Sequence, residues 1–192
     1  MSTHNFETLR GAVIDASLSN KWANAVQEWQ VVGVEEDQRA TGICVCGKTG
    51  LVYLYTIRNQ QTQQALFPIG SSCINHFGIE ELNTSVSALY RLLELRAAFA
   101  DQKHVDLTSE YFSRAMLAYL WENGAFPPNK YNQLNGENDY DFLVDMFNRH
   151  REFTKMQKSK VWVLLNRTIK DFVMNDERLG QLVQQPQGDD EV

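Results

Sequence analysis

The hydrophobic positions of the chain follow two periods, and the change between them divides the sequence. In residues 6–29 apolar side chains recur at helical spacing, with a break expected at Ser19 and Asn20. Four short runs rich in β-branched and aromatic residues follow, and they predict strands. These runs span residues 29–34, 42–46, 51–57 and 65–69. From residue 85 onward the helical period returns, so the pattern predicts an α+β protein.

The run at residues 51–57 gives the strongest strand signal. Both of its faces are largely apolar, which favours a central place in a sheet. The run at residues 65–69 contains Pro68, whose missing N–H favours an edge strand. Gly47 directly follows Cys46, and glycine accepts the positive φ that a knuckle-like turn often needs.

Four helices are expected in the second half of the chain. The first spans residues 85–100, and the second begins at a Thr108 cap and continues to residue 121. Residues 127–138 are rich in Pro, Asn and Gly and predict a loop. Asp139 is expected to cap the third helix, and Thr154 with Gln157 has the spacing of a capping box for the fourth.

Composition places the chain among globular proteins. Of its 192 residues, 43% are apolar and 22% are charged. No apolar run approaches the roughly 20 residues that span a bilayer, and the N-terminus lacks the pattern of a signal peptide. We therefore expect a cytoplasmic protein with no membrane association. The net charge of -6 does not favour nonspecific nucleic-acid binding.

The charge is unevenly distributed near the C-terminus. Residues 149–170 carry seven basic side chains and one acidic one, whereas residues 171–192 carry six acidic side chains and one basic one. The basic segment could follow a phosphate backbone, with Arg151, Lys155 and Lys158 as contacts. An ordinary amphipathic helix with a solvated cationic face explains the same pattern.

The three cysteines form the one constellation with a specific chemical meaning. Cys44 and Cys46 are separated by one residue, and Cys73 lies three residues before His76, so that this pair would share a helix face. Three thiolates and one imidazole are the ligand set of a closed tetrahedral zinc site. We therefore predict a structural Zn²⁺ held by Cys44, Cys46, Cys73 and His76.

Other interpretations of these residues stay open. Asn59, Asp37 or His4 could supply the fourth ligand in place of His76, and three buried cysteines without a metal are the plainest alternative. A catalytic Cys73–His76 pair would need a reactive, partly exposed thiolate. Because a metal explains three clustered cysteines better, and the chain lacks other enzyme motifs, we expect no catalytic residue and no enzymatic activity.

Residues 29–77 carry a resemblance to a family. The motifs are Cys-Val-Cys-Gly ending at Gly47, the segment 53–59, Ile-Gly-Ser-Ser-Cys ending at Cys73, and Phe77. Together they resemble uncharacterised zinc-binding proteins of phages, mobile elements and large DNA viruses, and residues 140–158 resemble helical tails in such proteins. The resemblance implies Cys44, Cys46 and Cys73 as ligands and a role near nucleic acid. It implies no enzymatic activity.

The sequence thus predicts three parts. Residues 1–84 would form an N-terminal helix and a small zinc-stabilised, treble-clef-like β-module, residues 85–178 a helical bundle, and residues 179–192 a disordered acidic tail. The expected function is that of a nonenzymatic adaptor, with a nucleic acid or a nucleic-acid enzyme as partner. The alternative is an inhibitor whose acidic surface occupies the basic groove of a partner, such as a host defence nuclease.

Overall fold

The N-terminal part of the chain consists of short helices that lead into an antiparallel sheet. The computed structural model describes residues 2–149 and 151–180. The first elements are α1 (Thr3–Asp15), α2 (Trp22–Ala25), the 3-10 turn η1 (Val26–Glu28) and β1 (Trp29–Glu36). The side chain of Ser2 caps α1 by accepting a hydrogen bond from the Asn5 N–H. The expected break at Ser19 and Asn20 lies between α1 and α2.

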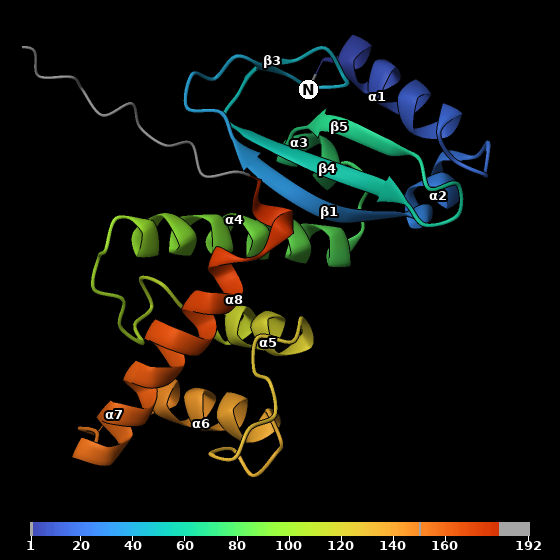
Figure 1. The fold of residues 1–192 in the computed structure, drawn as a ribbon. Helices are drawn as coiled ribbons and strands as arrows, with labels where there is room; N and C mark the ends of the chain where they lie inside the picture. Colours follow the sequence, from blue (N-terminus) through green and yellow to red (C-terminus); the bar gives the residue numbers. More distant parts are fainter. Residues whose placement is uncertain (1, 150, 181–192) are drawn as a thin grey trace, which may run out of the picture.

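The main sheet has three strands in the order β1-β4-β5, with β4 (Tyr53–Asn59) antiparallel to both neighbours (Figure 1). β2 (Gly42–Ile43) and β3 (Thr49–Leu51) form a separate two-stranded hairpin. The central position predicted from the apolar run at residues 51–57 is confirmed for β4. Pro68 lies on the edge strand β5 (Ala65–Ile69), as its missing N–H predicts.

The remaining regular elements of the described chain are helical. They are α3 (Ser71–Asn75), α4 (Glu80–Ala100), α5 (Arg114–Glu122), α6 (Glu137–Asn148), α7 (Lys155–Val163), the π-helical segment η2 (Leu164–Ile169), α8 (Lys170–Met174) and the 3-10 turn η3 (Glu177–Leu179). The capping box of Thr154 and Gln157 is present at the start of α7. Ser113, and not Thr108, caps α5. Asp139 lies inside α6, where it is buried, instead of capping the helix.

α4 is shared by the sheet and the helices. It packs against β1 and α3 on one side and contacts α5 and α8 on the other, so it lies between the sheet and the lower helices in Figure 1. Its apolar residues, including Leu89 and Leu92, belong to a core that extends through both parts. The domain boundary expected after residue 84 therefore falls inside one continuous helix.

The end of the described chain returns to the sheet. η3 packs on β1 and α4, and Leu179 is completely buried. The expected tail at residues 179–192 therefore does not include Leu179, and residues 181–192 lie outside the described part. Within the described residues, no helix combines the length and hydropathy needed to cross a membrane.

Candidate metal centre

The three cysteine side chains meet in one buried cluster. The Sγ atom of Cys73 lies 3.4 Å from the Sγ atoms of both Cys44 and Cys46. All three sulfurs lie within 4.8 Å of one another, and each cysteine is almost fully buried. The arrangement could hold a metal ion, as the sequence predicts.

The local backbone explains how Cys44 and Cys46 come to point at one place. The Gly47 N–H donates to the Cys44 carbonyl at 2.7 Å, and Gly47 has a φ of 86°, which is the left-handed conformation expected for this turn. The Val45 N–H donates to the Pro68 carbonyl at 2.9 Å and fixes the turn to β5. Cys73 then enters from the first turn of α3, which follows β5 directly.

Two N–H donors point at the sulfurs. The Gly70 backbone N–H lies 3.4 Å from the Cys44 Sγ. The Asn5 Nδ2 donates to the Cys46 carbonyl at 2.9 Å and lies 3.9 Å from the Cys46 Sγ. Such donors stabilise thiolates and orient metal ligands from outside the coordination shell. No spacing pattern linked Asn5 to the cysteines, because 41 residues separate it from Cys46.

Aromatic contacts hold α1 against this part of the fold. The ring of Trp22 packs edge-on against Phe6 and Phe77, with centroid distances of 5.7 and 5.5 Å. Phe6 lies on α1, and Phe77 follows α3. Edge-to-face packing of this kind adds to the stabilisation from apolar burial. The start of α1 is therefore fixed beside the cysteines by packing as well as by Asn5.

Without a metal, the thiols depend on one another. The hydrogen bond from the Cys73 thiol lowers the pKa of Cys44 to about 5. The same interaction raises the pKa of Cys73. The interaction between Cys44 and Cys73 therefore favours the thiolate form of Cys44, which is the form of cysteine that binds a metal.

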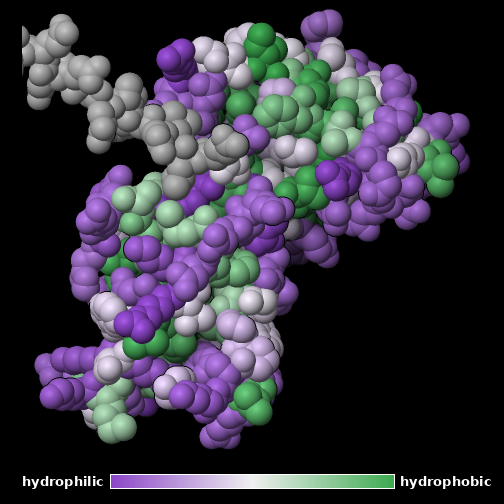
Figure 2. All heavy atoms as spheres, in the orientation of Figure 1, coloured by the Kyte–Doolittle hydropathy of each residue, from purple (hydrophilic) through white to green (hydrophobic). Residues whose placement is uncertain are grey.

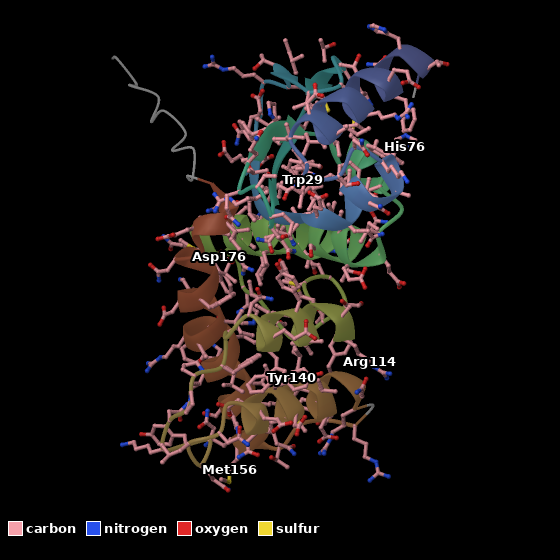
Figure 3. The ribbon with its side chains drawn as sticks, turned by 90° about the vertical axis from the view of Figure 1, so that its right-hand side faces the viewer. Trp29, His76, Arg114, Tyr140, Met156 and Asp176 are labelled. Carbon is pink, nitrogen blue, oxygen red and sulfur yellow. The ribbon has the colours of Figure 1, made fainter. Side chains whose placement is uncertain are left out.

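The structure does not bring His76 into the sulfur cluster. His76 follows the last residue of the five-residue helix α3, and its exposed ring packs edge-on against Phe6 at 5.9 Å. Figure 3 shows it at the margin of the sheet module. The backbone of His76 still has helical dihedral angles, but its exposed side chain packs against Phe6 and is not part of the cluster formed by the three sulfurs.

The other candidates for a fourth ligand lie in other environments. The Asn59 Oδ1 accepts from the N–H groups of Gln61 and Thr62 at 2.8 and 2.9 Å, so it shapes the turn after β4. The Asp37 carboxylate accepts from Thr41 and Gly42 in the β1–β2 connection. His4 is exposed in the first turn of α1, next to Asn5. Neither Asp37 nor His4 belongs to the cysteine cluster, and the side chain of Asn59 is engaged in its own turn.

The predicted nucleic-acid contacts lie far from the cysteines. Arg151, Lys155 and Lys158 are exposed at and before the start of α7. Figure 3 places Met156, the neighbour of Lys155, at the opposite end of the molecule from His76. The candidate metal centre lies in the core, and the basic segment lies on the surface at the other end of the molecule.

Comparisons with known proteins give no assignment. No protein-family model matches the chain, no curated protein matches it, and no solved structure matches its fold. The geometry of the described residues is therefore the basis for any functional proposal.

Proposed function

We propose that the protein is a nonenzymatic adaptor whose sheet module is held by a structural zinc ion. The observation that carries this proposal is the convergence of three buried sulfurs. In a tetrahedral site with Zn–S distances of about 2.3 Å, neighbouring sulfurs lie about 3.8 Å apart. The distances of 3.4 Å from Cys73 to its two partners are close to that value. Buried, all-sulfur sites are typical of structural zinc.

The order of elements around the cluster supports a treble-clef-like interpretation. A cysteine turn lies between β2 and β3, and the third cysteine begins a helix after the main sheet. This is the arrangement expected from the resemblance to phage, mobile-element and viral zinc proteins. The ion would add stability to the hairpin of β2 and β3, which consists of two short strands. A closed site requires a fourth protein ligand, which would come from a side chain at the start of α1, close to the Cys46 sulfur.

A nucleic-acid partner is the preferred target of the adaptor. Arg151, Lys155 and Lys158 form an exposed basic group, and within the described residues none of them has an ion-pair partner. Cations of this kind contact phosphates and make binding strongly salt-dependent. The group is small, so a protein that itself acts on nucleic acid is the second candidate for this partner.

Two measurements test the proposal. Elemental analysis of chain purified without chelator should give about one zinc per molecule, and Cys46→Ser should lose most of it. Less than half a zinc per chain contradicts the zinc centre. Binding to a labelled DNA duplex should weaken as salt rises, and Lys155→Glu with Lys158→Glu should weaken it further. Equal binding by this double variant and the parent chain contradicts the nucleic-acid contacts.

The inhibitor alternative rests on a different surface. Glu137, Asp141 and Asp145 are exposed and recur every four residues on α6, so they form an acidic stripe. Such a stripe fits the basic groove of a nucleic-acid enzyme. Inhibition of a nuclease without any binding to free nucleic acid would favour this alternative.

A further inference from the structure

A groove lies beside α7 at the end of the molecule remote from the metal centre. It has a volume of about 720 Å³, and it is lined by residues that include Tyr131, Met156, Lys160, Val163, Leu164 and Arg167. The lining residues come from the loop before α6, from α6 itself through Asp139, from α7 and from the π-helical segment η2. π-helical segments are rare and occur often at functional sites.

The groove is bordered by large apolar side chains that are almost fully exposed. Met156 is 85% exposed and Tyr131 is 81% exposed, and Leu134 in the same loop is 73% exposed. Monomeric proteins rarely keep neighbouring large apolar side chains in water unless the surface has a partner. Elsewhere on the visible face, the surface of the lower helices is mainly hydrophilic (Figure 2).

The loop that carries two of these side chains is held firmly. Asn132 is buried, and its Nδ2 donates to the Asp139 Oδ2 at 2.8 Å and to the Pro127 carbonyl at 3.0 Å. Its Oδ1 accepts from the Asn129 N–H at 2.7 Å. Tyr131 and Leu134 on either side of this anchor remain outside the core. A surface that is ordered in advance loses less entropy on binding.

Charge indicates what the groove would accept. Lys130 lies 4.9 Å from the centre of the Tyr131 ring, which lines the groove, and Arg167 lines the groove itself. Neither cation has a carboxylate partner in the described part of the chain. Lys160 is already paired with Asp139 at 2.8 Å. The acidic stripe of α6 lies on the face of that helix opposite Asp139, and so it points away from the groove.

We propose that this groove binds an amphipathic helix of a partner protein, with large apolar side chains on one face and carboxylates beside them. The apolar residues would fill the space between Tyr131, Met156 and Val163, and the carboxylates would pair with Lys130 and Arg167. Nucleic acid is disfavoured here. A duplex carries a charge about every 1.7 Å, and two cations beside an apolar floor match it poorly. The groove is also distinct from the cationic flank of α7 that carries Lys155 and Lys158.

A peptide selection tests this proposal on the full chain. The probe is a displayed library of random 16-residue peptides, and enriched sequences are resynthesised and measured by fluorescence anisotropy. We expect apolar residues at helical spacing together with Asp or Glu. Met156→Glu should weaken binding at least about tenfold, because it places a charge among the apolar contacts. Leu18→Glu is the matched control, since Leu18 is 77% exposed far from the groove.

A charge swap completes the test. Arg167→Glu should weaken the binding of an acidic peptide. A version of that peptide with Lys in place of its acidic residues should bind this variant better than it binds the parent chain. The proposal is overturned if no peptide family is enriched, or if Met156→Glu and Leu18→Glu bind equally. It is also overturned if a 20-nucleotide oligothymidine competes for the groove. None of these results depends on zinc content, so they are separable from a failure of the metal proposal.

Discussion

The Nζ of Lys160 on α7 lies 2.8 Å from the Oδ1 of Asp139 on α6. The Asp139 side chain is 4% exposed and that of Lys160 is 36% exposed, so the carboxylate depends on this ammonium and on Asn132 for its polar contacts. Because Asn132 also anchors the loop at residues 129–134, the pair connects the packing of two helices to the shape of the groove.

Removal of one member of this pair should be more harmful than removal of both. Lys160→Met would leave a buried carboxylate unpaired and should lower the free energy of unfolding by about 2 kcal/mol. The loss is below that of a fully buried pair because Lys160 is partly exposed to water. Lys160→Met with Asp139→Asn should recover part of it in urea unfolding. An additive double variant would contradict the proposed dependence.

Arg96 should hold the end of the described chain in place. It is 5% exposed on α4 and donates to the carbonyl oxygens of Leu179 and Gly180. Arg96→Met should cost about 2 kcal/mol and should increase amide hydrogen exchange in residues 177–180. Arg91→Met is the control, because Arg91 lies exposed on the same helix. Unchanged exchange in Arg96→Met would show that packing of Leu179 alone is sufficient.

Asn5 should affect metal affinity without supplying a thiolate. Asn5→Ala removes the contacts with the Cys46 carbonyl and sulfur, and groups outside the coordination shell typically change affinity by about 10–100-fold. We expect the lower end of that range because the contact with sulfur is long. Competition with a zinc chelator measures the change. Thr8→Ala, on the same helix but bonded to the His4 carbonyl, should behave as the parent chain.

Metal removal should destabilise the sheet module first. A ligand present at about 100 times its Kd stabilises the folded state by about 2.7 kcal/mol, and a chelator abolishes this term. Thermal unfolding should therefore begin at a lower temperature after chelation and recover when zinc is added. Cys73→Ser should show the low temperature in both conditions. A chelator-insensitive transition would mean that the three thiols are only core residues.

The raised pKa of Tyr55 predicts that the folded protein loses stability in strong alkali. Tyr55 is 2% exposed on the central strand, and burial raises its pKa to about 12 from an ordinary value near 10. Burial opposes ionisation of Tyr55 in the folded state. The contribution of this residue to stability is therefore complete below about pH 10 and is lost as the pH rises through 12. Absorbance near 295 nm should show a group of late-titrating tyrosines that includes Tyr55, because the pKa values of Tyr90, Tyr111 and Tyr119 are raised as well. Tyr55→Phe should remove one tyrosine from this late group.

The parts of the fold that follow local rules could be predicted from the sequence. The central strand, the edge position of Pro68, the turn at Gly47 and the capping box of Thr154 each depend on neighbouring residues. These features are set by backbone chemistry and by burial on both faces of one segment. They required no knowledge of distant parts of the chain.

The predictions that failed depend on contacts between distant segments. Asp139 has the chemistry of a helix cap, but Asn132 and Lys160 draw it into the interior. Asn5 reaches Cys46 only because Phe6 and Trp22 pack α1 against the residues after α3. Such pairings carry no signature in the spacing of residues. At the cysteine cluster, the spacing of residues was sufficient to predict that the three sulfurs meet, but it was not sufficient to predict the position of His76.

The helix formed by α7, η2 and α8 also has a geometric consequence. It includes 20 residues from Lys155 to Met174 and therefore extends for roughly 30 Å. The groove runs along this helix from Met156 to Thr168, and the C-terminal part of the helix packs against α4, on which the sheet rests. A molecule held in the groove would thus be kept at a fixed distance from the sheet.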